Sequence, residues 1–286
     1  METWLKYIKL YLRPWLYRLP QIKTLYDLAA RYIALCEGYY NWYNFQWDGE
    51  YKFLRQVVRG MGTPTIFDVG ANIGQWAKMV LKECPHAILH LFEPFPPSFE
   101  LLSQSFSSTP ATTNCVAVGD INGSVDLLLY NNLEHSLIVN EQQICKGKIA
   151  VPVITLDEYC IQKNIDQIHL LKIDVEGAEI KVLLGARTLI RECRIVAIQF
   201  EYSYKWIASR AFLRDAYTIL SPQYRLFKIL PAGLWELPEY HPSLENFRYA
   251  NFVAVNQDDK ELLERLGPRV RNWPPQVYGV GWRVGV

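Results

Sequence analysis

Short apolar runs alternate with amphipathic stretches through the middle of the chain. Runs rich in β-branched and aromatic residues predict strands at residues 65–67, 87–92, 112–118, 168–173 and 195–200. Apolar positions at helical spacing separate these runs and predict helices at residues 75–84, 97–105, 178–190 and 212–220. Strands that alternate with helices predict an α/β protein with a parallel sheet, right-handed crossovers and helices on both faces.

The pattern changes after the third expected strand. Residues 124–130 and 148–154 alternate apolar and polar positions without a clear helix between them. This predicts an antiparallel β insertion near residues 121–155. The last strands are expected at residues 224–230 and 250–255, separated by a loop of about twenty residues, and loops of that length are often functional.

The domain organisation follows from these elements. We expect a helical, aromatic-rich extension over residues 1–49, one α/β domain over residues 50–256 and a C-terminal tail over residues 257–286. Residues 1–20 combine aromatic residues at helical spacing with Lys and Arg, so they suit either an anionic membrane surface or packing on this domain or a second subunit.

A second helix is expected over residues 21–44, with Leu25, Leu28, Ala29 and Tyr32 facing inward. The chain contains no apolar run near the ~18 residues of a membrane span, and its N-terminus lacks the features of a secretory signal. We therefore expect a cytoplasmic protein, with a peripheral membrane contact or a contact between subunits through residues 1–45 as open alternatives.

Composition narrows the function classes. The 286 residues carry a net charge of +1 and half of them are hydrophobic, which excludes a disordered chain and argues against a general nucleic-acid binder. Six cysteines are scattered without C-x-x-C or zinc spacing, as expected for reduced thiols in a cytoplasmic protein. The function classes that remain are an enzyme and a domain that binds small molecules.

The stretch TIFDVGANIGQW, at residues 65–76, predicts a strand, a glycine turn and the start of a helix. Its pattern is D-x-G-x-x-x-G, and Asn72 stands where the dinucleotide fingerprint needs its middle glycine. Asp68 would repel a pyrophosphate but attract an ammonium group or a ribose hydroxyl. The turn therefore suits S-adenosylmethionine better than NAD, and an ordinary strand-to-helix turn is the alternative.

Five expected strands end in or just before an acid, and their ends should meet at one rim of the sheet: Asp68, Glu93, Asp120, Asp174 and Glu201. Glu93 follows Gly70 by 23 residues, which is close to the spacing of an acid that binds ribose hydroxyls. Asp120 suits either a hydrogen bond from an adenine amino group or a plain turn.

The stretch LLKIDVEGAEIKVLLG, at residues 170–185, carries the second group of candidates. Lys172 within an apolar strand requires a carboxylate partner, and Asp174 or Glu176 can supply it. Asp174 would accept a proton from a substrate hydroxyl or bind a divalent metal, unless the acids only shape the turn. His135 in the insertion is either a base or a bystander.

Taken together, FDVGANIGQW, LFEPFP, VAVGD, EHSL, TLDEY and LLKIDVEGAEIKVLLGA resemble the FkbM family of S-adenosylmethionine-dependent methyltransferases over roughly residues 50–256. The resemblance implies a class I methyltransferase fold, a Rossmann-like, mostly parallel sheet of seven strands with the last one antiparallel. It also implies a cofactor-binding set of Asp68, Gly70, Ala71, Asn72, Gly74, Glu93, Asp120 and Ser136.

The family mostly transfers methyl to oxygen, so the resemblance implies O-methylation of a hydroxyl on a sugar, glycan or natural product by in-line displacement. Asp174 is the expected base, assisted by Glu176 or His135 and held by Lys172, and a magnesium ion between Asp174 and Glu201 is left open. The alternatives are an NAD-dependent or nucleotide-sugar oxidoreductase and a non-catalytic binding protein on the same fold.

Overall fold

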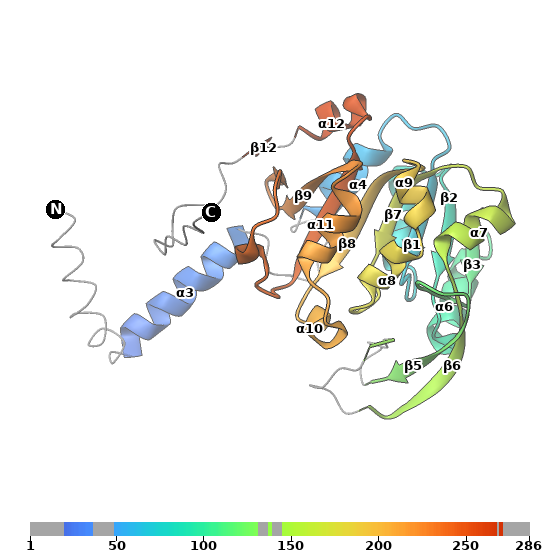
Figure 1. Cartoon of the computed structure of the whole chain (residues 1–286), viewed down its shortest axis with the longest axis horizontal. Coiled ribbons are helices and arrows are strands. Elements are labelled where there is room, and N and C mark those ends of the chain that lie inside the picture. Colours follow the sequence, from blue (N-terminus) through green and yellow to red (C-terminus); the bar gives the residue numbers. More distant parts are fainter. Residues whose placement is uncertain (1–19, 37–48, 131–136, 139–144, 268, 271–286) are drawn as a thin grey trace, which may run out of the picture.

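The computed structural model describes residues 20–36, 49–130, 137–138, 145–267 and 269–270 (Figure 1). The helices are α3 (Pro20–Cys36), α4 (Glu50–Val58), α5 (Gln75–Glu83), α6 (Pro96–Phe106), α7 (Leu156–Lys163), α8 (Glu179–Leu184), α9 (Arg187–Arg191), α10 (Lys205–Ser209), α11 (Leu213–Leu220), the 3₁₀ turn η1 (Pro242–Leu244) and α12 (Lys260–Leu266). The strands are β1 (Thr65–Val69), β2 (Ile88–Phe92), β3 (Thr112–Asn114), β4 (Ala117–Val118), β5 (Gly123–Leu129), β6 (Gly147–Ile154), β7 (Ile168–Ile173), β8 (Ile195–Tyr202), β9 (Tyr224–Leu230), β10 (Gly233–Glu236), β11 (Ala250–Asn256) and β12 (Arg269–Val270).

The main sheet has the order β12-β10-β9-β11-β8-β7-β1-β2-β3. Strands β8, β7, β1, β2 and β3 pair in parallel, and β11 lies antiparallel between β8 and β9. The prediction of a mostly parallel seven-stranded Rossmann-like sheet with an antiparallel last strand is confirmed. Two further strands, β10 and β12, extend its edge, and β10 forms a hairpin with β9 inside the segment expected to be a loop.

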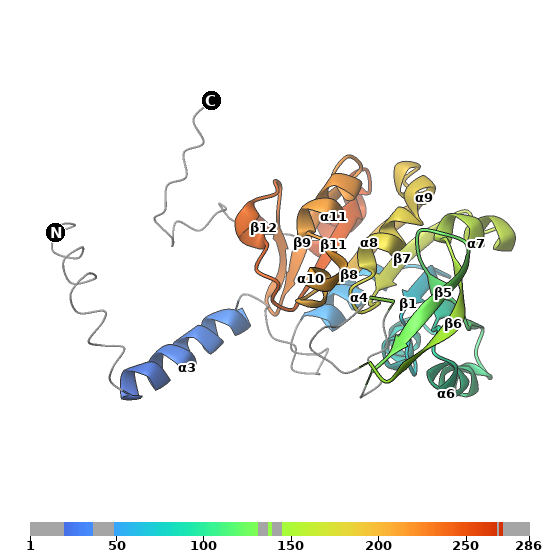
Figure 2. The ribbon, with the colours of Figure 1, turned by 60° about the horizontal axis from the view of Figure 1, so that its bottom comes forward.

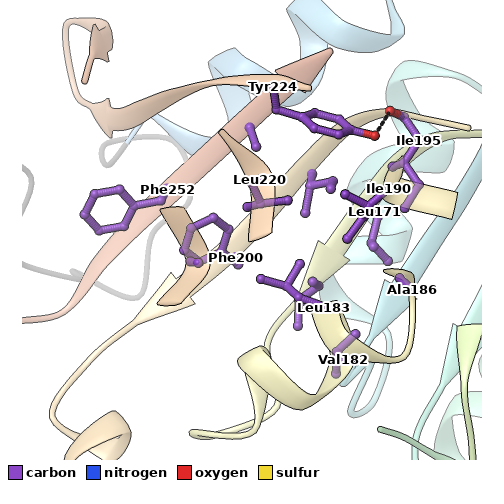
Figure 3. Close-up of a cluster of buried hydrophobic side chains, with 14 of the residues drawn as sticks. Leu171, Val182, Leu183, Ala186, Ile190, Ile195, Phe200, Leu220, Tyr224 and Phe252 are labelled. Carbon is purple, nitrogen blue, oxygen red and sulfur yellow. Dashed lines mark hydrogen bonds between the residues drawn. The ribbon is translucent and has the colours of Figure 1, made fainter. Parts of the chain in front are cut away.

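Two hydrophobic clusters cover the two faces of this sheet because successive strand residues point to opposite sides. On one face, side chains from β7, β8 and β9 pack against α8, α9 and α11 (Figure 3). There the Tyr224 hydroxyl donates a hydrogen bond of 2.8 Å to the Ile195 carbonyl oxygen. On the other face, alternate residues of the same strands pack against α4, α5 and α12.

The strand expected at residues 112–118 is divided between two sheets. β3 pairs with β2 in the main sheet, whereas β4 pairs with β6 in a second sheet of order β4-β6-β5. In this small mixed sheet β5 and β6, from the predicted insertion, pair antiparallel and β4 pairs with β6 in parallel, and the sheet lies beside the carboxyl ends of the main strands (Figure 2). The sequence pattern could not reveal the division, because which sheet each half joins depends on pairing with the distant strands β2 and β6.

The single helix expected at residues 178–190 is two short helices, α8 and α9. The break lies at Gly185, where a Cβ atom would come within 1.9 Å of the Gly119 carbonyl oxygen. The Asp157 carboxylate then receives the Thr188 and Leu189 backbone N–H groups at 2.9 and 3.0 Å and caps the start of α9. Contacts distant in sequence therefore divide a continuous helical pattern.

Both ends of the described chain differ from the sequence expectation. The segment expected to be a tail begins with α12, whose Leu262, Leu263 and Leu266 are buried in the core. At the other end, Leu25 and Tyr32 of α3 were expected to face inward but are 65% and 68% exposed, so that expectation is wrong. Over the residues that the structure describes, no helix combines the length and apolarity needed to span a bilayer.

Candidate active site

The glycine loop after β1 is held tightly against two neighbouring strand ends. The N–H groups of Gly70 and Ala71 both donate to the Phe92 carbonyl oxygen, at 3.0 and 2.9 Å. Gly70 has φ of +88°, and a Cβ atom there would lie 1.8 Å from the Asp174 carbonyl oxygen. Only glycine fits this position, because it alone tolerates the backbone conformation and the close approach.

Glu93, at the end of β2, fixes the other side of the loop. One carboxylate oxygen accepts the Asn72 N–H at 2.9 Å and the other accepts the Phe95 N–H at 2.9 Å. The side chain is buried, and burial raises the pKa of Glu93 to about 7 although both backbone hydrogen bonds oppose the shift. The acid predicted from spacing does lie against the glycine loop, and its contact with a ribose stays a prediction.

One cavity of about 730 Å³, open solvent at its mouth included, connects the loop with the second sheet and with the end of β7. Its polar wall comes from the glycine loop and Glu93, and Asp174 and Glu176 lie on the β7 side. The remaining wall is mainly apolar and consists of Phe92, Pro94, Val116, Ala117, Val118, Leu127, Leu137 and Val175. The cavity therefore joins a polar pocket, an apolar slot and an acidic rim.

The predicted cofactor residues, and the candidate base His135, fall into four groups. Gly70, Asn72 and Glu93 line the cavity, whereas Asp68, Ala71 and Gly74 shape the loop without lining it. Asp120 is exposed and is not among the lining residues, so its contact with an adenine amino group stays a prediction that the cavity does not support. His135 and Ser136 lie outside the described residues.

Lys172 is buried between two carboxylates. Its Nζ lies 2.9 Å from Asp174 Oδ2 and 3.7 Å from Asp68 Oδ1, and it sits over the Trp76 ring at 5.7 Å from the centroid. Burial would lower the pKa of Lys172, but the charges of Asp174 and Asp68 raise it above its usual range. The expected pairing of this in-strand lysine with Asp174 is confirmed, and Lys172 stays a cation at neutral pH.

Asp68 and Asp174 differ although both face Lys172. Burial raises the pKa of the fully buried Asp68 to about 6. Burial also acts on Asp174, but the charge and hydrogen bond of Lys172 and a hydrogen bond with Glu201 hold its pKa below the usual value. The Asp174 side chain is 35% exposed and lines the cavity. It is therefore an ionised carboxylate that a substrate can reach.

Glu201, at the end of β8, is the proton-bearing partner of Asp174. It is 8% exposed, and burial, followed by the charges of Asp174 and Glu176, raises its pKa well above the usual value. Glu176 in turn forms a close ion pair with Lys205 of α10. The pKa of Glu201 is thus raised while that of Asp174 is lowered, so a proton held by this pair resides on Glu201 rather than on Asp174.

Glu179 holds the turn that carries Asp174 and Glu176. Its Oε1 accepts the Val175 and Gly177 N–H groups at 3.1 and 3.2 Å. Glu176 has φ of +59°, in the left-handed region that residues other than glycine rarely adopt. Glu179 therefore stabilises an unusual turn.

A row of buried polar side chains links this site to the first residue of α4. The sequence pattern did not predict this row. Glu50 is 3% exposed and accepts hydrogen bonds from Gln199 Nε2, at 2.9 Å, and from Asn251 Nδ2. Asn251 stands opposite Glu201 in the β8–β11 register. Gln199 is a polar residue within a largely apolar strand, and this position was the signal in the sequence that could have indicated the buried polar contact.

Within the part of the chain that the structure describes, no group of three or more His, Cys, Asp or Glu side chains is placed to hold a metal ion. For the magnesium ion considered between Asp174 and Glu201, these residues therefore offer no third such ligand. Its presence stays an untested expectation.

The strand order, with a cavity at the carboxyl ends of the strands, is that of the class I, Rossmann-like methyltransferase fold. A family model described as the Methyltransferase FkbM domain matches residues 68–225, which is more than half of the chain. The chain therefore belongs to the FkbM methyltransferase family and is an S-adenosylmethionine-dependent methyltransferase. The resemblance stated from the motifs is confirmed.

Curated relatives include the 2-O-methyltransferase NoeI of Sinorhizobium fredii, 27% identical over 64% of this chain and 82% of that protein. The hexuronic acid methyltransferase AglP of Haloferax volcanii is 26% identical over 47% of this chain and 54% of its own length. The methyltransferase sdnD of Sordaria araneosa is 30% identical over 43% of this chain and 60% of its own length. This chain thus spans little more than half the length of the last two.

Solved structures are more distant. The plantazolicin methyltransferase BpumL in complex with SAH aligns with 90% of this chain and 99% of its own, at 9% identity and a TM-score of 0.41. The O-methyltransferase from Bacillus cereus in complex with SAH aligns with 72% of this chain and 80% of its own, at 9% identity and a TM-score of 0.41. The fold assignment rests on the strand order of this chain instead.

Proposed function

We propose that this methyltransferase transfers methyl to a hydroxyl group of a sugar, glycan or related natural product. The observation that carries the proposal is the cavity that joins the glycine loop and Glu93 to the carboxylate of Asp174. A donor bound at the loop and an acceptor at Asp174 would share this space. The names of the relatives NoeI and AglP, which refer to 2-O-methylation and to hexuronic acid, support an oxygen acceptor on a sugar.

The residues that line the cavity suit S-adenosylmethionine. Glu93 still has carboxylate lone pairs to accept ribose hydroxyls, because each of its oxygens receives one backbone N–H group. The apolar slot between Val116–Val118 and Leu127 suits a planar base. Asn72 in place of the middle glycine, together with a carboxylate at Glu93, suits a ribose better than a pyrophosphate. When bound, the cofactor supplies an electrophilic methyl group for in-line displacement.

The residues of this chain align the acceptor and remove its proton. Asp174, ionised and reachable from the cavity, accepts the hydroxyl proton as the oxygen attacks. Lys172 keeps Asp174 in place and ionised. Glu201, which retains its own proton, donates a hydrogen bond to Asp174 and so keeps the acidic rim from carrying two adjacent negative charges.

Cofactor choice is tested by titrating S-adenosylhomocysteine and NAD separately into the full chain by calorimetry. We expect S-adenosylhomocysteine to bind and NAD to give no heat of binding. Binding of NAD without S-adenosylhomocysteine would favour the oxidoreductase alternative, and binding of neither would favour the non-catalytic one. Methyl transfer from labelled donor to a panel of neutral and acidic glycosides, with and without chelator, then tests the acceptor class and the metal.

The affinity for S-adenosylhomocysteine should depend on pH through Glu93. Its pKa of about 7 means that the free protein holds a proton there below neutrality, and ribose hydroxyls donate best to the ionised form. Binding should therefore release a proton, and affinity should fall by up to about tenfold per pH unit below pH 7 and level off above it.

Calorimetry from about pH 5.5 to pH 8, in buffers of different ionisation enthalpy, measures this dependence. The Glu93→Gln variant is the control, because it should bind more weakly and lose most of the dependence. Asp68, with a pKa of about 6, and Glu179, with a pKa of about 7, remain in that variant. An unchanged pH dependence would assign the proton to one of these two acids and remove Glu93 from the ribose contact.

A further inference from the structure

The helix α3 exposes apolar side chains that a water-soluble domain would normally bury. Leu25 is 65% exposed, Leu28 is 58% exposed and Tyr32 is 68% exposed. Figures 1 and 2 both show α3 extending away from the α/β domain rather than lying along it. The apolar side chains of α3 are therefore available to a partner.

These side chains form a coherent face. Leu25, Leu28, Ala29 and Tyr32 follow the three- and four-residue spacing that places them along one side of a helix. Lys23, Asp27 and Arg31 lie on the opposite side at the same spacing. The helix thus has an apolar face and a polar face with more basic than acidic residues, which is the pattern of helices that lie in a membrane interface.

Charge is unevenly divided along the chain. Residues 1–36 contain six Lys or Arg and two Asp or Glu, for a net charge of +4, whereas the whole chain carries only +1. The remaining 250 residues therefore carry a net charge of −3. The same N-terminal stretch holds Trp4 and Trp15 before α3, and Trp is favoured at the level of lipid headgroups.

We propose that α3 docks on an anionic lipid surface and lies parallel to it. Positive charge and an apolar face on one helix match acidic headgroups above acyl chains. A second copy of the same segment is the less suitable occupant, because pairing would bring two segments of net charge +4 together.

Docking in this way would tether the methyltransferase domain to the lipid surface. Twelve residues, 37–48, connect α3 with Gly49 at the start of α4, so the two helices are at most about 45 Å apart along the chain. Glu50, the first residue of α4, belongs to the buried row that ends beside Glu201.

The test is co-sedimentation of the full chain with vesicles of phosphatidylcholine, made with and without phosphatidylglycerol. We expect binding only when phosphatidylglycerol is present, and weaker binding at high salt. The double variant Leu25→Ser/Leu28→Ser should reduce lipid affinity by about tenfold or more. The double variant Lys23→Glu/Arg31→Glu should reduce it by a similar factor without removing apolar surface.

The matched control is Leu101→Ser/Ile161→Ser, which changes two leucine-sized side chains that are 53% and 67% exposed on α6 and α7. It should leave lipid affinity unchanged, and an equal loss would mean that binding is not specific to α3. Absence of binding to the anionic vesicles would overturn the proposal. So would light scattering that shows a dimer in wild type and a monomer in Leu25→Ser/Leu28→Ser with lipid binding unchanged. Circular dichroism verifies the fold of each variant, and none of these readings depends on the methyl acceptor.

Discussion

The Asp174→Asn variant should lose about a hundredfold or more of its turnover, because a positioned general base commonly contributes that factor. An asparagine keeps the size and the hydrogen bond from Lys172, but it cannot accept the hydroxyl proton. Cofactor affinity should stay near that of wild type, since the loop and Glu93 are untouched. Turnover with a labelled methyl donor, together with calorimetry of S-adenosylhomocysteine, measures both quantities.

The control for this variant is a substitution at Asp166, at the other end of β7. Asp166 precedes the start of β7 and is exposed, whereas Asp174 follows its carboxyl end. The same substitution, Asp166→Asn, should therefore leave turnover unchanged. Equal turnover in Asp174→Asn and wild type would remove Asp174 from the chemistry. A large loss of cofactor affinity in Asp174→Asn would instead assign it to the donor site.

The Gly70→Ala variant should lose cofactor binding almost completely. The added methyl group would lie 1.8 Å from the Asp174 carbonyl oxygen, and the backbone φ of +88° disfavours any side chain. The two atoms nearest to the added methyl group are the backbone oxygen and carbon of Asp174, so the loop must move away from β7. We expect affinity for S-adenosylhomocysteine to fall by about hundredfold or more, with a lower melting temperature, because backbone strain and steric overlap act together.

Gly62→Ala is the matched control, because a Cβ atom at Gly62 meets nothing within 4 Å and its φ is not in the left-handed region. This variant should bind S-adenosylhomocysteine as wild type does and melt at a similar temperature. Both substitutions are followed by calorimetry and by thermal unfolding. If Gly70→Ala bound the ligand normally, the close contact between the loop and β7 would not be required for the site.

The sequence predicted the parts of the site that depend on local pattern. The strand, the glycine turn and the helix after Asp68 lie where the apolar run and the glycines place them, and Glu93 reaches the loop as its spacing indicated. Lys172 has the carboxylate partner that a lysine in an apolar strand requires. Each of these features follows from short-range periodicity or from the cost of burying a charge.

Other features depended on contacts between distant segments. The sequence predicted that Asp120 lies with the other strand-end acids. The strand before it, β4, belongs to the second sheet instead, and Asp120 is exposed. The hydrogen bonds of Glu50 with Gln199 and Asn251 span 149 and 201 residues. No local pattern encodes a contact of that separation, so sequence reasoning could not find it.

The sequence by itself determined the family, the alternating α/β architecture and the acids that end its strands, because motif spacing and hydrophobic periodicity are properties of neighbouring residues. Only the tertiary structure decided which of those acids are ionised. Asp174 and Glu201 are both strand-end acids in sequence, and they differ because burial and neighbouring charges hold one as a carboxylate and leave the proton on the other. The tertiary structure also decided that the apolar face of α3 is exposed, since amphipathic spacing defines a face but not what covers it.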